Sequence, residues 1–278
     1  MDIASFRRRI MAYEARNRRP MPWRAPPLRV RKDRSANPYA IIVSEIMLQQ
    51  TQVSRVTEKY PLFMRTFPDF STLARAPLDK VLRAWSGLGY NRRAAFLKAL
   101  SETIVREHRG AVPRNPAALA ALPGIGKATA GSICAFAFDM PVAFIETNIR
   151  RVFIHFFFKN RKRVRDQDIL PLVERACPKQ GSRDWYYALM DYGAFLAGQI
   201  ENPNRKSAHY ARQKRFEGSE RELRGKIVRV LLSGKRVSFK RLSEEVREPL
   251  GRIRHAIASL ERDRMVRTAG RSVCLVSS

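Results

Sequence analysis

The chain has 278 residues, of which 54 are Lys or Arg and 25 are Asp or Glu, so its formal net charge is +29. With 45% hydrophobic residues it can build one large or two modest globular domains, which excludes a collagen-like or wholly disordered polymer. Apolar runs stay short of the roughly 18 residues that a membrane helix needs, and the N-terminus lacks the apolar core of a secretory signal. Three scattered cysteines exclude a disulfide scaffold and a four-thiolate metal site.

The surplus of positive charge indicates an anionic partner. Each Lys or Arg that neutralises a phosphate releases condensed counterions, so a strongly basic chain favours nucleic acid. A ribosome-associated protein or a binder of anionic membranes would carry a similar charge. Composition therefore predicts a nucleic-acid partner without fixing which one.

Helical periodicity dominates the first two thirds of the chain. Ile3, Phe6, Ile10 and Tyr13 share one face of a first helix, which ends at a basic, proline-rich loop over 20–38. The pattern predicts further helices at about 39–50, 53–67, 71–75, 78–84, 91–108, 115–121, 127–137, 147–157, 167–177 and 183–198. No useful strand alternation precedes position 210, so this part is predicted to be all-α.

The last quarter of the chain has a different composition. A basic linker over 201–217 precedes helices predicted at about 219–233, 240–246 and 250–264. Two short apolar stretches then flank Thr268-Ala269-Gly270-Arg271, as in a hairpin. Three helices and a hairpin outline a small α+β winged helix over 218–278. Such a domain contacts DNA with its third helix and its wing, or else it is a packing appendage of the domain before it.

One motif carries closely spaced glycines between two predicted helices. It runs from Leu122 to Gly131 and reads LPGIGKATAG. Gly124 and Gly126 allow a tight hairpin whose backbone N–H groups point outward at the start of the next helix, where phosphate can bind. The plain alternative is a turn between two helices.

A second motif places a carboxylate in apolar surroundings. Glu45 follows Ile41-Ile42-Val43-Ser44 and precedes Ile46-Met47-Leu48. A low-dielectric environment favours the protonated carboxyl, which suits a general acid. A solvated Glu on the outer face of the helix is the alternative.

Four motifs in this order resemble the MutY-type adenine glycosylases of the helix-hairpin-helix (HhH-GPD) DNA glycosylase family. They are MPWR with NPY at 21–24 and 37–39, SEIMLQQTQ at 44–52, WSGLGY at 85–90 and the LPGIG hairpin. The resemblance covers about residues 5–200 and implies an all-α fold of two lobes over 1–200. In that fold the N-terminal helix packs with a lobe at 141–200, and residues 30–140 form a helical barrel with the hairpin.

The resemblance also implies catalytic roles. Glu45 falls on the acid that protonates a purine ring nitrogen, and Glu146 and Asn148 fall on the family's Asp-x-Asn, whose Asp stabilises the oxocarbenium-like transition state. The Glu at position 146 is a departure, because its extra methylene moves the charge by about 1.5 Å. We expect the backbone to compensate, whereas a reshaped site or a simple N-cap role are the alternatives. The two acids are expected to meet in one DNA-sized groove.

Further residues match positions that contact double-stranded DNA in the family. Gln50 matches the residue that wedges beside the flipped nucleotide, and Tyr90 matches an aromatic wedge at the partner base. The complete set is Arg24, Gln49, Gln50, Thr51, Tyr90, Asn91, Arg92, Leu122, Gly124, Ile125, Gly126, Lys127, Thr129 and Arg150.

Three departures limit what the resemblance implies. Ala128 stands where bifunctional relatives place a Schiff-base Lys, so hydrolysis without efficient strand scission is expected. The stretch 195–207 has none of the four cysteines that hold an iron–sulfur cluster in relatives, so no cofactor or metal is expected. The chain ends too early for the additional domain that inspects 8-oxoguanine, a function that the winged helix would have to replace.

The sequence thus predicts a monofunctional DNA glycosylase of base excision repair. The expected substrate is adenine opposite 8-oxoguanine or guanine in duplex DNA. A mismatch uracil or thymine glycosylase, a glycosylase for another damaged base, and a catalytically inactive DNA-binding protein are the alternatives. We expect a cytoplasmic monomer that binds no membrane and that is associated with the nucleoid if its source is bacterial.

Overall fold

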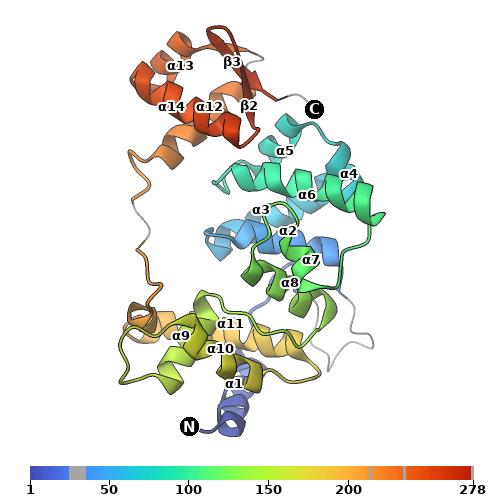
Figure 1. The fold of residues 1–278 in the computed structure, drawn as a ribbon, viewed down its shortest axis with the longest axis vertical. Helices are drawn as coiled ribbons and strands as arrows, with labels where there is room; N and C mark the ends of the chain where they lie inside the picture. Colours follow the sequence, from blue (N-terminus) through green and yellow to red (C-terminus); the bar gives the residue numbers. More distant parts are fainter. Residues whose placement is uncertain (25–35, 213–214, 234–235, 277–278) are drawn as a thin grey trace. The chain divides into compact units, whose positions relative to one another are not determined.

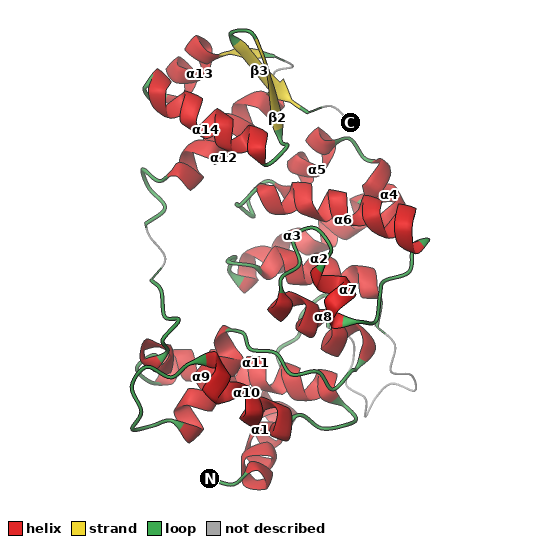
Figure 2. Ribbon diagram, viewed as in Figure 1, coloured by secondary structure: helices red, strands yellow, loops and turns green. Residues whose placement is uncertain are grey.

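The structure, a computed structural model, describes residues 1–24, 36–212, 215–233 and 236–276. Helices form nearly all of its regular structure, and the strands belong to the C-terminal end of the chain (Figure 1 and Figure 2). The all-α prediction for the first two thirds is confirmed. Positions 25–35 of the predicted basic loop lie outside the described residues. No helix in the described ranges is long and apolar enough to cross a bilayer.

Contacts divide the chain into two compact units, and each is described by itself. The first unit comprises Met1–Glu45, Val112–Ala121 and Ile125–Arg212. The second comprises Ile46–Ala111, Leu122–Gly124 and Gln213–Ser278. This division differs from the predicted domains, because the C-terminal segment belongs to the same unit as residues 46–111.

The first unit is organised around one long helix, α11. Its elements are α1 (Ile3–Asn17), the first part of α2 (Pro38–Leu48), α7 (Pro116–Ala120), α8 (Lys127–Phe138), α9 (Thr147–Phe157), α10 (Asp166–Ala176), α11 (Ser182–Gln199) and the 3-10 helix η2 (Pro203–Lys206). Helices α1, α8 and α9 all contact α11. The ring of Phe6 makes edge-to-face contacts with Phe153, Phe156, Phe157 and Trp185, at centroid distances of 5.1 to 5.8 Å. These rings attach the N-terminal helix to α9 and α11.

The second unit begins with the remainder of α2 and continues as a helical layer. It contains α3 (Val53–Thr66), α4 (Phe70–Arg75), α5 (Leu78–Trp85) and α6 (Arg92–His108), with α6 packed on α4 and α5. Local chemistry sets several helix ends: the Asp69 carboxylate, for example, accepts the backbone N–H of Thr72 at 2.7 Å and caps α4. For most helix ends, the observed boundary differs from the predicted one by one or two residues.

The predicted winged helix is present in the second unit. Its elements are α12 (Glu220–Ser233), β1 (Val237–Ser238), α13 (Phe239–Val246), α14 (Leu250–Arg262), β2 (Val266–Ala269) and β3 (Ser272–Leu275). The strands form an antiparallel sheet in the order β1-β3-β2, in which Arg267 faces Cys274. Strand β1 was not predicted, since two residues are too few to show an alternation of apolar and polar side chains.

Candidate active site

Glu45 is the only Asp or Glu of α2, a helix whose buried residues are apolar except for Ser44. Ile41, Ile42 and Val43 before it are buried, as is Ile46 after it, whereas Glu45 itself keeps some exposure. The pKa of this carboxyl is raised to about 7. Burial is the main cause and the charge of Glu146 adds to it, while a hydrogen bond from Ser132 and the charge of Arg24 act in the opposite direction. Glu45 can therefore hold a proton near neutral pH and still be reached by a ligand.

Ser132, on α8, is the hydrogen-bond partner of Glu45 and was not identified from the sequence. Its Oγ lies 2.5 Å from Oε2 of Glu45 and 2.9 Å from the backbone oxygen of Thr129. A hydroxyl has one proton to donate, so it cannot donate to both oxygens at once. When Ser132 donates to Glu45, the bond stabilises the carboxylate and opposes the rise in pKa that burial causes. Ser132 therefore limits how strongly Glu45 holds its proton.

Replacing Ser132 by Ala is expected to shift the pH dependence of base release. The hydrogen bond from Ser132 lowers the pKa of Glu45, so its loss raises that pKa above about 7. A general acid acts in its protonated form, so activity falls as pH rises through its pKa. The basic limb of the single-turnover rate profile should therefore move to higher pH in Ser132→Ala. A limb that stayed in place would show that Ser132 does not set the proton affinity of the acid.

Glu146 is the N-cap of α9. Its Oε1 accepts the backbone N–H groups of Asn148 and Ile149 at 2.6 and 2.7 Å, and Nδ2 of Asn148 lies 3.3 Å from Oε2. Glu146 thus caps α9, and a catalytic role for the same carboxylate stays a prediction. The extra methylene is accommodated because the side chain turns back onto its own helix, where an Asp cap would also place its carboxylate.

The two carboxyls belong to the same unit and lie within range of each other's charge. Burial raises the pKa of Glu146, while the N–H groups at the start of α9 and the charges of Arg150 and Arg151 oppose that increase. The pKa of Glu146 is nevertheless raised overall, because burial outweighs these groups. Among the residues that the structure describes, no backbone N–H and no cation is bonded directly to Glu45. The N–H groups at the start of α9 still favour the charged form of Glu146, and Glu45 has no counterpart to them among the described residues. This difference is what one acid and one anion in the same site would need.

Asp191, on α11, carries a buried ion-pair cluster that sequence analysis did not find. Its side chain is 0% exposed and accepts bonds from both terminal nitrogens of Arg24 (2.8 and 2.9 Å) and from Nε of Arg19 (2.6 Å). Burial by itself would raise the pKa of Asp191, but the two arginines outweigh it and the pKa is lowered. The Arg24 guanidinium also stacks over the Tyr187 ring, 4.5 Å from its centroid. We predicted that Arg24 contacts DNA; its side chain, 6% exposed, is instead committed to Asp191.

Arg150 requires a similar correction. Its Nε and one terminal nitrogen donate to the two carboxylate oxygens of Asp166, each at 2.7 Å, and the side chain is 17% exposed. A bidentate pair of this kind occupies the guanidinium face that a phosphate would need. The structure thus gives Arg150 a partner within the protein in place of the predicted DNA contact.

Gly193 allows α11 to approach the first turn of α9. A Cβ at Gly193 would lie 2.6 Å from Cβ, 2.8 Å from the backbone oxygen and 2.9 Å from Cα of Asn148. The backbone oxygen of Gly193 also accepts a bond from Arg151 at 2.8 Å, and the same nitrogen donates to Oδ1 of Asn148. The position of Asn148 and its neighbour Glu146 therefore depends on a glycine in the next helix.

Gly193→Ala is expected to reduce base release at least tenfold and to lower stability by about 1–3 kcal/mol, because the added carbon displaces backbone atoms of α9. Gly198→Ala in the same helix is the control. A Cβ at Gly198 meets nothing within 4 Å, so this change should be neutral or stabilising. Urea unfolding and single-turnover rates of both variants provide the comparison, and equal behaviour of the two would contradict the role given to Gly193.

The hairpin before α8 has the backbone that its glycines predict. Gly124 has φ +78°, and a Cβ there would lie 2.9 Å from that of Phe96. Gly126 is the N-cap of α8 without a side-chain cap, and Lys127 and Thr129 stand in the first turn. Leu122 and Ile125, both predicted to contact DNA, are buried with exposures of 5% and 6%. Their side chains thus serve the core, and only their backbone groups remain for a phosphate.

The loop between α5 and α6 is organised by Arg93, a residue that sequence analysis overlooked. This buried guanidinium donates to the backbone oxygens of Ile46, Met47, Leu88 and Gly89 and to the Thr51 hydroxyl, at 2.7 to 3.1 Å. Burial lowers the pKa of Arg93 to about 10, so it stays charged. A single cation therefore joins the end of α2 to the WSGLGY loop.

The predicted DNA-contacting residues near this loop differ in their surroundings. Gln50 is exposed with φ +54°, and Nε2 of Gln49 donates to the backbone oxygen of Gly124 at 3.3 Å. Tyr90, also left-handed at φ +48°, has the guanidinium carbons of Arg93 and Arg221 5.5 and 5.3 Å from its ring centroid. The predicted contacts of Asn91 and Arg92, at the start of α6, and of Thr51 stay predictions.

The segment after α11 does not suit an iron–sulfur cluster. It forms η2, in which buried Asn204 donates to the backbone oxygen of Thr147 at 3.0 Å. The backbone N–H of Val164 donates to the oxygen of Lys206, and the N–H of Ala208 donates to the oxygen of Val164, each at 2.8 Å. Amide and backbone groups thus hold this loop against α9, where a cluster would need thiolates. Within the described ranges, no group of three or more His, Cys, Asp or Glu residues could hold a metal ion.

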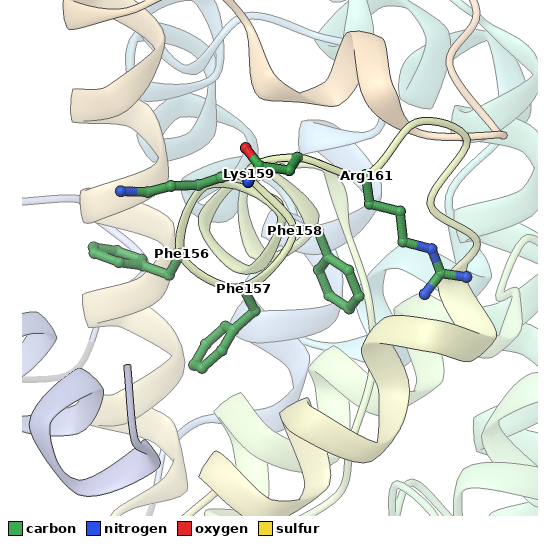
Figure 3. A pocket seen from close by; sticks show the side chains of 6 residues that line it. Phe156, Phe157, Phe158, Lys159 and Arg161 are labelled. Atoms are coloured by element: carbon green, nitrogen blue, oxygen red, sulfur yellow. The ribbon is translucent and has the colours of Figure 1, made fainter.

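An open pocket of about 480 Å³ lies at the other end of α9. Residues 156–161 line it, and Figure 3 shows Phe156 and Phe158 pointing to opposite sides of the helix end. Phe156 packs on Phe6, and the Arg161 guanidinium lies 5.7 Å from the Phe158 ring centroid. The lining contains none of the predicted catalytic residues, so we do not assign the site to this pocket.

Comparison with solved structures identifies the class of the fold. A thermostable thymine-DNA glycosylase superposes with a TM-score of 0.60 at 26% identity, over 73% of this chain and 91% of that one. The fold is thus that of a helical DNA glycosylase with a helix-hairpin-helix. Residues 43–176 match the family described as HhH-GPD superfamily base excision DNA repair protein.

Two sequence relatives place the chain more closely. It is 32% identical over 240 residues to the adenine DNA glycosylase of Mycolicibacterium smegmatis, covering 80% of this chain and 78% of that protein. It is 36% identical over 185 residues to that of Buchnera aphidicola, covering 66% of this chain and 50% of that protein. The chain belongs to the HhH-GPD superfamily and is similar to its adenine glycosylases. For several adenine DNA glycosylases that the chain matches, it spans half or less of their length.

Proposed function

We propose that this protein is a DNA glycosylase of base excision repair that hydrolyses the N-glycosidic bond of a flipped adenine opposite 8-oxoguanine or guanine. The observation that carries this proposal is the carboxyl of Glu45, whose pKa is raised to about 7 and which lies in the same unit as Glu146, the N-cap of α9. The names of the sequence relatives support the same substrate.

The proposed reaction divides the work between the two acids. Glu45 donates its proton to a ring nitrogen of adenine, so the base leaves as a neutral molecule. The Glu146 carboxylate stabilises the positive charge that develops on the sugar, and water completes the hydrolysis. Asn148 and Arg151 hold the Glu146 end of α9 in place.

The proposal includes hydrolysis without efficient strand scission. Position 128 in the first turn of α8 is Ala, which has no amine for a Schiff base with the sugar. We also propose that the protein acts as a monomer on duplex DNA and without an iron–sulfur cluster, since η2 is held by amide and backbone groups. Iron content of the purified protein and its mass in solution test these two points.

Thymine or uracil in a mismatch is the second candidate substrate. The likeness to a thymine-DNA glycosylase over 91% of that chain favours it. Chemistry distinguishes the two: an adenine ring nitrogen needs a proton to leave as a neutral base, whereas thymine and uracil can leave as delocalised anions. A carboxyl that holds its proton near pH 7 therefore favours adenine.

A panel of duplexes tests the function directly. Each carries adenine, thymine, uracil or a damaged base opposite 8-oxoguanine, guanine or another partner, and abasic sites are cleaved with alkali after incubation. We expect release of adenine opposite 8-oxoguanine or guanine, with strand breaks only after alkali. Preferential release of thymine or uracil would replace the first substrate by the second. Tight binding without release of any base would identify a DNA-binding protein.

A further inference from the structure

The winged helix has an exposed basic surface that the proposed chemistry does not use. Residues 218–278 contain 15 Lys and Arg against 7 Asp and Glu. The exposed face of α14 carries Arg254, Ala258 and Arg262 at intervals of four residues, one above the other along the helix. Ile253, Ala256, Ile257 and Leu260 on the other side of α14 are buried in the core of the domain.

The acidic residues near this face have partners within the protein. The Glu261 carboxylate accepts the backbone N–H and the hydroxyl of Thr268, at 2.8 and 2.6 Å. Asp263 pairs with Arg224 and lies 3.8 Å from Arg92. In contrast, Arg254 and Arg262 have no ion-pair partner among the residues described. The face therefore presents positive charge to any approaching polyanion.

The shape of the α14 face permits a close approach. Ala258 stands between the two arginines, and Gly251 lies on the same face, where an added Cβ would meet nothing within 4 Å. No packing contact thus explains this glycine. The hairpin that follows α14 adds exposed Arg267 in β2 and Arg271 at its turn. Small residues in the centre with arginines around them suit a helix that enters a groove of duplex DNA.

Within the same unit, the winged helix contacts the loop that carries the predicted wedge. Arg221 of α12 donates to the Tyr90 hydroxyl, and Arg83 of α5 donates to the backbone oxygen of Leu232. The Arg92–Asp263 pair adds a third link. Duplex DNA bound at the Tyr90 loop would thus continue beside this domain.

We propose that the winged helix is a second duplex-DNA-binding element, in which the exposed face of α14 and the following hairpin contact the DNA that flanks the target base. This proposal rests on DNA being the substrate, as proposed above, and extends it to a site outside the glycosylase region. The phosphate backbone of duplex DNA is the occupant that the charge and the small central residues favour.

The test compares two double variants of the full-length protein that each remove two positive charges. Arg254→Gln/Arg262→Gln alters the proposed surface, whereas Arg229→Gln/Arg236→Gln removes exposed arginines elsewhere in the domain, on α12 and before β1. Both pairs are exposed, so the thermal midpoints of both variants should match the parent protein. Binding to an undamaged duplex of about three helical turns is titrated at several KCl concentrations.

Loss of two phosphate contacts is expected to lower the slope of log Kd against log salt by about 1.8 in the α14 variant, while the control keeps the slope of the parent. Single-turnover base release at saturating enzyme should stay unchanged in both. An unchanged slope in the α14 variant, or equal losses in both variants, would overturn the proposal. A variant that loses affinity for structured RNA but keeps its affinity for duplex DNA would also overturn the proposal. Because the duplex is undamaged, this result is independent of whether the protein releases any base.

Discussion

Glu45→Gln is expected to lower the single-turnover rate of base release by about 10²- to 10⁴-fold, which is the usual contribution of a positioned general acid. The amide keeps the shape of the carboxyl but has no proton to donate. The pKa of about 7 also predicts that the parent protein loses activity as pH rises above neutrality. The residual activity of the variant, in contrast, should not fall as pH rises above neutrality. Its affinity for duplex DNA should stay close to that of the parent.

The stability of the same variant provides an internal control. In the folded protein the pKa of Glu45 is raised from its ordinary 4.5 to about 7, so between these values the folded state holds a proton that the unfolded state has lost. The parent protein therefore loses stability as pH rises through this window, and Glu45→Gln does not. Thermal unfolding should show a gain for the variant at pH 8 and a smaller one at pH 5. If the variant were inactive because it is misfolded, it would be less stable at both values.

Asp191→Asn is expected to lower the free energy of unfolding by about 3–5 kcal/mol, because it leaves the buried Arg24 guanidinium without its counter-charge. The carboxylate is fully buried and also accepts bonds from the backbone N–H and the side chain of Arg19. Urea unfolding measures the effect. Arg24 also acts on the proton affinity of Glu45, so the pH profile of the variant should change together with its stability.

Two comparisons separate this effect from a general loss of charge. Glu201→Gln breaks an exposed ion pair with Arg205 and should leave the unfolding transition almost unchanged. Combining Asp191→Asn with Arg24→Gln should cost less than the sum of the two single changes, since neither buried charge is then left unpaired. Additive losses would show that Asp191 and Arg24 do not stabilise each other.

Local patterns in the sequence determined the helices, the hairpin and the acid. A helix end depends on nearby residues, as the Asp69 cap shows, and periodic apolar residues mark the buried face of each helix. Glu45 could be identified because apolar neighbours surround it within α2 itself. The winged helix followed from three helices and a hairpin, but its sheet also includes β1, whose pairing with β3 joins positions 34 and 36 residues apart.

The partners of these residues were decided by the tertiary structure. Ser132 lies 87 positions from Glu45, and Asp191 lies 167 from Arg24, so no local pattern connects them. Arg24 and Arg150 look like surface cations in the sequence because their counter-ions come from other helices, and Arg93 is recognisable only once five oxygens surround it. The sequence by itself therefore determined which groups are available for chemistry. Burial and charge contributed by distant segments decided which of them hold a proton, form an ion pair or stay exposed to a ligand.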